Sequence, residues 1–460
     1  MNKRKAFLGL LIIFTITLCI QNNIWAANGN DIESIIKQYQ QETKCEHVSV
    51  AVFDNGKITY YGERESLYQI GSMTKAFTGL AIQKLINEGL VDADGVVSDY
   101  INGFEAYYGS ERADIAVKDL LGQKSGYTNI EKDYPSATET MTLAEWADSI
   151  SGRELSFKPG TEYTYSNVNY NLLGLIIENV SGISYREYME REILIPLGLR
   201  DTFVGTPDDN RIIEGTRLGY RHVFKFPLTV KEASIPAGYF YSNAEDMGRW
   251  IEIWTESCDL PEDLKEALSM VKEQLKEEGD YYSGWELFAD GITGHSGGTP
   301  NYSSRIVFDK KKQMGACVLS NLNVAATTDS LCNGIFDIVA GKAPAELNRD
   351  IWTIFDNIFA IVTMTGMFLF PIILVTKKRS VLIAFDVILI SLLTLVLILF
   401  PMTFGAGMKE IVFIWAPWSL AGGLSAIIAD IAGAAVKLLS GNKNADNNKT
   451  GKGQTAEGYN

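Results

Sequence analysis

Three apolar runs near the C-terminus are the feature that most constrains how this chain folds. Each run has the length of a membrane-spanning helix, and they occupy roughly residues 358–375, 381–400 and 411–436. Upstream of them, residues 28–345 have the mixed polar and apolar composition of a globular domain. The sequence therefore predicts a globular domain at 28–345, a three-helix transmembrane domain at 351–437 and a disordered cytoplasmic tail at 438–460.

The N-terminus has the pattern of a secretory signal peptide at residues 1–26. A basic Lys3-Arg4-Lys5 segment precedes an apolar run, and Ala26 ends an acceptable cleavage site. An uncleaved N-terminal anchor is the alternative. A second basic cluster, Lys377-Lys378-Arg379, lies between the first two C-terminal apolar runs, where the positive-inside rule favours the cytoplasm. We therefore expect a multi-pass protein of the cell membrane, with its globular domain on the extracytoplasmic side.

Composition and cysteine spacing argue against several kinds of partner and site. The formal net charge of −15 and the lack of a basic patch argue against nucleic acid as a partner. The four cysteines after the predicted signal show no zinc spacing, and the histidines are dispersed, so we expect no metal site. The sequence also contains no phosphate-binding loop or dinucleotide fingerprint, and no cofactor is predicted. The cysteines are either buried thiols or include a disulfide pair.

The order of strand and helix patterns predicts an α+β fold. Strand-like alternation occurs at 47–53, 57–61, 238–242, 282–288, 291–295, 303–308 and 314–319. Helical spacing occurs at 32–43, 73–88, 117–121, 143–149, 169–180, 185–195 and 328–341, and helix 73–88 is expected to be buried on one side. Because strands come from both ends of the domain, we expect an antiparallel sheet covered by helices, with a helical insertion in the middle. The site would lie in the cleft between these two parts.

Ser72 and Lys75 form an S-x-x-K pair at the start of predicted helix 73–88. Residues three apart lie one helical turn apart on the same side, so the Lys75 amine can take the Ser72 hydroxyl proton if burial keeps it partly neutral. The Ser72 backbone N–H can also bind a developing oxyanion. An ordinary N-cap is the alternative for Ser72. A cation in the first helical turn is locally unfavourable, however, and this favours the catalytic interpretation.

A second signature, Tyr165-Ser166-Asn167, follows a turn-rich segment. The Tyr165 hydroxyl could share the proton with Lys75 and pass it to a leaving amine, while Asn167 could orient Lys75 or the substrate. The structural alternatives are a packed tyrosine and, for Asn167, an N-cap of helix 169–180.

A third signature begins at His295 on a predicted strand edge and continues through Ser296-Gly297-Gly298. Paired glycines on a strand let a substrate backbone approach closely, so His295 and Gly297 are candidates for substrate binding. The Gly298 backbone N–H is the candidate second oxyanion donor. Taken alone, His295 would be interpreted as a structural histidine.

The S-x-x-K, Y-x-N and H-x-G elements together resemble the serine β-lactamase and penicillin-binding-protein superfamily. The resemblance is closest to its class C and D-aminopeptidase-like branch, whose pattern segments 71–78, 120–126 and 159–160 also match. It implies a β-lactamase/transpeptidase-like fold and an acyl-enzyme mechanism, with Ser72 as nucleophile and Lys75 and Tyr165 as acid and base. His295 stands where β-lactamases usually carry Lys. In this respect the chain resembles the peptidases and esterases of the branch more than its β-lactamases.

The apolar runs add a narrower resemblance, supported by segments 302–304 and 413–417. They resemble the periplasmic membrane-bound peptidases that mature nonribosomal-peptide prodrugs, the colibactin peptidase among them. This resemblance implies cleavage beside a D-residue in a peptide or lipopeptide near the bilayer, including removal of an N-acyl-D-amino-acid leader in antibiotic biosynthesis. Ser234 and Thr299 fall where larger or amide-bearing specificity residues are expected.

Two other functions are left open by the sequence. One is a penicillin-binding D,D-carboxypeptidase or β-lactamase, and the other is a non-catalytic sensor that a β-lactam acylates. Also left open are the natural substrate, a monomeric or homodimeric state, and the role of Asp386 and Asp430 within the apolar runs.

Overall fold

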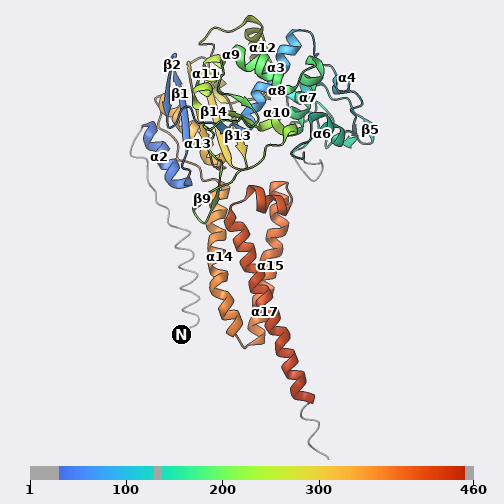
Figure 1. Cartoon of the computed structure of the whole chain (residues 1–460), viewed down its shortest axis with the longest axis vertical. Helices are drawn as coiled ribbons and strands as arrows, with labels where there is room; N and C mark the ends of the chain where they lie inside the picture. The colour runs from blue at the N-terminus through green and yellow to red at the C-terminus, as the bar shows by residue number, and fades with distance from the viewer. Residues whose placement is uncertain (1–30, 129–136, 451–460) are drawn as a thin grey trace, which may run out of the picture. The chain divides into compact units, whose positions relative to one another are not determined.

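A seven-stranded antiparallel sheet organises the globular part of the chain, as the strand pattern predicts (Figure 1). Its strand order is β11-β12-β13-β14-β15-β1-β2. The strands are β1 Val48–Asp54, β2 Lys57–Tyr61, β11 Tyr281–Tyr282, β12 Trp285–Leu287, β13 Thr293–Thr299, β14 Tyr302–Asp309 and β15 Met314–Ser320. Strand β1 pairs with β15, with Val48 opposite Ser320, so the sheet joins the two ends of the globular domain.

The structure is a computed structural model that describes residues 31–128 and 137–450. The predicted signal peptide at 1–26 therefore lies outside the described residues. The described chain divides into two units. We call them the globular unit, which contains residues up to Arg217 and Val223–Ile351, and the helical unit, which contains Leu218–His222 and the chain from Trp352 onward.

Helices cover both faces of the sheet. Helices α2 (Ile32–Thr43) and α13 (Ala325–Val339) pack on one face, where the Tyr39 hydroxyl hydrogen-bonds to Ser320 and Thr328. Helix α11 (Ala244–Trp254) packs on the other face. There Ile251 of the helix lies so close to Gly315 of β15 that a Cβ at Gly315 would collide with it. Successive strand residues point to opposite faces, so His295 and Ser296 of β13 face different layers.

Helix α3 (Thr74–Asn87) is buried on all sides, which corrects the expectation of a one-sided helix. Its residues from Thr74 to Leu85 are buried, including the polar ones. Helices α7 (Asn167–Ser181), α10 (Ile235–Gly238) and α12 (Glu262–Glu278) surround it. The β11–β12 turn also presses on it, since a Cβ at Gly79 would lie 2.5 Å from the Ser283 carbonyl oxygen. The apolar spacing marks only one of its buried faces, because small and polar residues fill the others.

Several predicted strands have different boundaries in the structure, among them 291–295, which is β13 at Thr293–Thr299. The predicted strand 282–288 is a hairpin of β11 and β12, because Ser283 and Gly284 both have positive φ and form a two-residue turn. The predicted strand 238–242 begins with helix α10, and only Phe240–Ser242 is strand β10. Strand β10 belongs to a separate three-stranded sheet with β3 and β7.

The remaining elements of the globular part are short. The strands are β3 Tyr68–Gln69, β4 Ala106–Tyr108, β5 Glu111–Arg112, β6 Arg153–Glu154, β7 Phe203–Val204, β8 Thr216–Gly219 and β9 His222–Lys225. The helices are η1 Gly71–Met73, α4 Val97–Tyr100, α5 Val117–Leu121, α6 Leu143–Ile150, α8 Tyr185–Tyr188, η2 Met189–Leu194, α9 Ile195–Leu197, η3 Glu232–Ser234 and η4 Ala289–Gly291.

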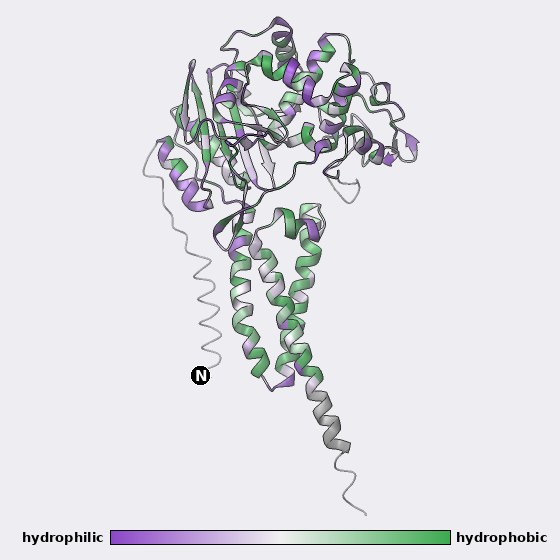
Figure 2. Ribbon diagram, viewed as in Figure 1, coloured by the Kyte–Doolittle hydropathy of each residue, from purple (hydrophilic) through white to green (hydrophobic). Residues whose placement is uncertain are grey.

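The helical unit contains three segments long and apolar enough to cross a membrane, at Ile351–Val375 (α14), Arg379–Phe404 (α15) and Trp418–Ser440 within α17. In Figure 2 most of the ribbon of these helices is green, the colour of hydrophobic residues. The third predicted run, 411–436, is interrupted: η5 (Ile411–Trp415), which follows α16 (Met408–Glu410), ends at an extended Ala416. Pro417 explains the interruption, because proline lacks an N–H and disfavours a helical residue before it.

The first part of the predicted disordered tail is helical. Helix α17 runs from Trp418 to Thr450, past the predicted boundary at 438. Extending an existing helix needs no new nucleation, so polar residues can continue it.

The helical unit also includes the turn between β8 and β9. In this turn Tyr220 and Arg221 have positive φ, and their backbone N–H groups donate to the two carboxylate oxygens of Asp356, at 2.7 and 2.6 Å. The Asp356 carboxylate, at the start of the first apolar helix, is therefore buried but hydrogen-bonded.

Candidate active site

Ser72 lies in η1, directly before helix α3. It is not the N-cap of either helix, since those positions are held by Ile70 and Met73. Instead its hydroxyl oxygen is a hydrogen-bond partner of Lys75, with Nζ 3.0 Å from Oγ. The structure therefore places the two residues of the S-x-x-K element in direct contact.

Lys75 is completely buried, and its amine has three oxygen partners. Besides Ser72 Oγ, Nζ donates to Asn167 Oδ1 at 2.7 Å and to the Ala237 carbonyl oxygen at 2.5 Å. None of these three acceptors is a carboxylate, and burial holds the pKa of Lys75 well below its usual value. A lysine in this environment can act as a neutral amine near neutral pH.

The second signature begins helix α7. Asn167 is the first residue of that helix and Ser166 is its N-cap, so the helix begins before the predicted 169 and the alternative role of Asn167 as its N-cap is wrong. Ser166 accepts from the Val168 N–H, which leaves the Asn167 side chain available to Lys75. The ring centroid of Tyr165 lies 4.8 Å from Lys75 Nζ.

The Tyr165 hydroxyl is buried and has no hydrogen-bond partner among residues 31–128 and 137–450. Burial raises its pKa well above the usual value, and the nearby Ser72 hydroxyl opposes part of that rise. Tyr165 is therefore a protonated donor in the resting site, next to both Ser72 and Lys75.

His295 faces the same place from strand β13. Its Nδ1 lies 2.6 Å from the Ser296 carbonyl oxygen, and its Nε2 is buried without a partner in the described part of the chain. Burial, with a smaller contribution from the Lys75 charge, lowers the pKa of His295 to about 3. The imidazole is thus neutral at physiological pH, and its ring centroid is 6.1 Å from that of Tyr165.

Strand β13 and η1 approach each other so closely that glycines are required. A Cβ at Gly71, whose φ is +52°, would lie 2.4 Å from the Gly298 nitrogen. A Cβ at Gly297 would lie 2.1 Å from the Ile70 carbonyl oxygen, whereas a Cβ at Gly298 would meet nothing within 4 Å. The Gly298 backbone nitrogen therefore lies against Gly71, the residue that precedes Ser72.

The opposite face of β13 is held by charged groups. Ser296 donates to Asp329 at 2.9 Å and accepts from Arg305 at 2.7 Å. Arg305 also lies 3.7 Å from Glu286 of the neighbouring strand β12. These contacts fix the strand from behind while His295 faces the site.

The two predicted specificity residues lie near the motifs but do not join the hydrogen bonds among them. Ser234 is half-buried in η3, three residues before the Ala237 carbonyl that binds Lys75. Thr299 is buried at the end of β13, and its hydroxyl donates to Asn301 at 3.2 Å.

Sequence reasoning missed three residues that support the site. Gln123 has a positive φ of 58° and is buried, and its side chain accepts from the Ser166 N–H at 2.9 Å. Its backbone oxygen accepts from the Thr164 N–H, so Gln123 holds the loop that carries Tyr165. Tyr170 and Tyr281 are the others. In the sequence, segment 120–126, which contains Gln123, stands out only as a match to the family pattern. No local sequence pattern indicates a role for Tyr170 or Tyr281.

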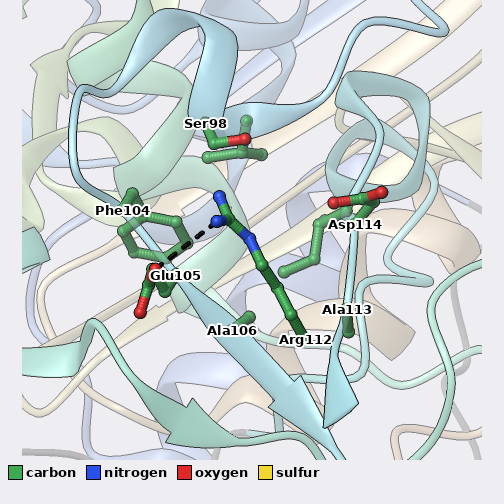
Figure 3. A pocket seen from close by; sticks show the side chains of 9 residues that line it. Ser98, Phe104, Glu105, Ala106, Arg112, Ala113 and Asp114 are labelled. Atoms are coloured by element: carbon green, nitrogen blue, oxygen red, sulfur yellow. Dashed lines mark hydrogen bonds and ion pairs between the residues drawn. The ribbon is translucent and has the colours of Figure 1, made fainter.

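A small pocket elsewhere contains none of these residues. It is lined by residues 97–98, 104–106 and 112–115, and Figure 3 shows the Arg112 side chain lying between Phe104 and Asp114. Arg112 pairs there with Glu105 at 3.4 Å. Across the described ranges, no group of three or more His, Cys, Asp or Glu is placed to hold a metal ion, and Cys45, Cys258, Cys317 and Cys332 are unpaired.

Comparison with known proteins decides the family. A family model described as Beta-lactamase matches residues 32–334, which is most of the globular part. This chain belongs to the β-lactamase family. The membership confirms the predicted superfamily and fold.

Two relatives and one solved structure illustrate the range of similarity. The chain is 32% identical over 317 residues to Protein flp of Staphylococcus aureus (strain NCTC 8325 / PS 47), covering 64% of this chain and 63% of that protein. It is 33% identical over 146 residues to a putative D-alanyl-D-alanine carboxypeptidase of Salmonella heidelberg (strain SL476), covering 30% and 34% of the two chains. The chain thus spans less than two thirds of the length of either relative.

The solved structure is the octameric penicillin-binding protein homologue from Pyrococcus abyssi. It superposes with a TM-score of 0.60 at 24% sequence identity, covering 71% of this chain and 80% of that chain. At this identity the likeness concerns the fold alone.

Proposed function

We propose that this chain is a membrane-anchored, exported serine peptidase that cleaves amides next to a D-residue through an acyl-enzyme. The proposal rests on the hydrogen-bond partners of the Lys75 amine. As a neutral amine, Lys75 can keep its two N–H donations to Asn167 and Ala237, and its lone pair then faces the Ser72 hydroxyl. This arrangement supplies a base for a serine nucleophile without a carboxylate.

The proposed reaction has two halves. Ser72 Oγ bonds to the amide carbon while Lys75 takes its proton, and the carbonyl electrons move to the oxygen. The N–H groups of Ser72 and Gly298 bind that oxyanion. The carbon–nitrogen bond then breaks, and the leaving amine takes a proton from Tyr165, which Lys75 restores. Water, deprotonated by the same groups, attacks the acyl-Ser72 ester and releases the acid.

The neutrality of His295 supports an amide substrate without a carboxylate at that position. A lysine ammonium there would offer a fixed positive charge to the carboxylate that β-lactams and D,D-peptides carry. The His295 imidazole is neutral because burial lowers its pKa to about 3, so it offers a hydrogen bond instead of a charge. An N-acyl-D-aminoacyl amide, the leader of a peptide or lipopeptide prodrug, meets this requirement. The three apolar helices favour amphiphilic substrates, which concentrate near a bilayer.

The first test is the Ser72→Ala variant of the full-length protein in detergent. Turnover should fall by about 10³-fold or more, because the covalent route disappears. Ser66→Ala is the matched control, since Ser66 is only partly buried and its hydroxyl donates to Glu63. Substantial turnover by folded Ser72→Ala protein would rule out the mechanism.

Substrate class is tested with three compounds: an N-acyl-D-Asn amide, its L-isomer and a chromogenic cephalosporin. We expect the highest kcat/KM for the D-amide. Equal rates on the two isomers would retain the hydrolase and discard the stereospecific role.

The second candidate is a D,D-carboxypeptidase or β-lactamase. The name of the Salmonella relative favours it, although the match covers 30% of this chain. A cephalosporin preference of about tenfold, or 1.4 kcal/mol of transition-state stabilisation, would select this candidate.

A further inference from the structure

Tyr281 lies at the centre of a group of aromatic rings beside the site, although it belongs to none of the sequence signatures. It comes from β11, the edge strand of the sheet, and it is buried. Its ring centroid is 5.8 Å from that of His295, 6.1 Å from Tyr165 and 5.9 Å from Tyr163. Its contacts with His295 and Tyr165 are both edge-on, a favourable geometry for aromatic pairs.

His295 needs such support because its two nitrogens have different roles. A backbone carbonyl oxygen can only accept, so Nδ1, 2.6 Å from the Ser296 oxygen, carries the proton. Nε2 is then an unprotonated acceptor, and it is buried without a partner in the described ranges. The short hydrogen bond to Ser296 does not by itself fix the His295 ring. If that bond breaks, the imidazole can rotate about its bond to Cβ and turn its other edge toward Ser296.

The other end of Tyr281 is also fixed. Its hydroxyl donates to the Tyr170 hydroxyl at 3.3 Å, and Tyr170 donates to the Leu121 carbonyl oxygen at 3.2 Å. The Tyr170 ring centroid is in turn 5.6 Å from Lys75 Nζ. Tyr281 therefore connects the strand side of the site, at His295, with the helix side, at Tyr170 and Lys75.

We propose that Tyr281 is a positioning residue: its ring holds His295 in the Nδ1–H tautomer, so that the free Nε2 lone pair faces the reacting groups beside Tyr165. The expected effect of Tyr281 on the reaction rate rests on the proposed function. Its expected effect on the His295 ring rests only on the edge-on contact between the two rings.

The test uses full-length protein in detergent with ¹⁵N-labelled histidine, because the chain has 3 histidines and the spectrum is simple. The ¹⁵N shifts of a fixed Nδ1–H imidazole are well separated, whereas exchange between tautomers brings them together. In the wild type we expect one pair of separated resonances that stays constant from pH 5 to 8. His295→Gln assigns that pair by its loss.

Two variants separate the ring of Tyr281 from its hydroxyl. Tyr281→Leu should bring the His295 resonances together and lower kcat/KM by about tenfold, as expected for a misplaced site group. Tyr281→Phe keeps the ring and should keep the separated resonances, with kcat/KM within about threefold of the wild type. Tyr282→Leu is the matched control: Tyr282 is the next strand residue, it is also buried, and its ring lies near Gly122.

Unchanged His295 resonances in folded Tyr281→Leu protein would overturn the proposal, and so would an equal change in Tyr282→Leu. A changed spectrum without any loss of D-amide hydrolysis would support the packing role and count against the proposed function. Failure of the packing role and failure of the proposed function therefore give different results.

Discussion

At the residue scale, the burial of His295 contributes to how the protein responds to acid. Its pKa falls from 6.5 to about 3 because burial disfavours the charged ring. Between these two values the His295 ring binds a proton in the unfolded chain and not in the folded chain. The contribution of His295 to the free energy of unfolding therefore decreases as the pH falls from 6.5 toward 3, by at most about 1.4 kcal/mol per pH unit.

His295→Gln should remove this dependence. We expect the wild type to lose more stability than the variant between pH 7 and pH 4, measured by denaturant unfolding at both values. His222→Gln is the control, since His222 is exposed on β9. Parallel pH dependence in wild type and His295→Gln would contradict a neutral, buried His295.

At the element scale, the direct contact between β13 and η1 fixes how Gly297 and Gly298 lie relative to Ile70 and Gly71. Gly297→Ala would place a methyl group 2.1 Å from the Ile70 oxygen, so the strand must move. We expect a loss of about 1–3 kcal/mol in stability, as for other overpacked sites. Acylation by a serine-reactive fluorophosphonate should slow in parallel.

Gly298→Ala is the matched control on the same strand, because its Cβ would meet nothing within 4 Å. Its melting temperature should equal that of the wild type. Equal stability of both variants would show that the strand and η1 are not in contact at Gly297.

The elements also show how far sequence alone can reach. The Ser72–Lys75 contact could be predicted because one helical turn fixes it locally, and the order of strands was sufficient for the fold class. The sequence predicts one strand at 282–288, because the alternation of side chains continues through the two-residue turn Ser283-Gly284 of the hairpin. The positions of Tyr281 and Tyr170 depend on strand order and helix packing, which no local pattern encodes.

At the scale of the whole molecule, the charge of the loops predicts the orientation of the helices in the membrane. Lys377 and Lys378 lie between α14 and α15, and Arg379 begins α15, so this connection should face the cytoplasm and the α15–α16 connection the outside.

The prediction is checked with single cysteines in a Cys258→Ser background, because Cys45, Cys317 and Cys332 are buried. A membrane-impermeant maleimide should label Gly407→Cys in intact cells and Ser380→Cys only after lysis. Both positions are exposed. The reverse labelling pattern would invert the topology and place the globular unit in the cytoplasm.

The pairing of β1 with β15 has a consequence for when the candidate site can form. Strand β1 comes from the N-terminal end of the domain, and its partner strand ends at Ser320, so the sheet depends on long-range pairing, which makes folding slow. Ser72 lies early in the chain, whereas His295 and Gly298 lie on β13, among the last strands of the domain. The residues of the candidate site can therefore come together only once nearly the whole globular unit is available to fold.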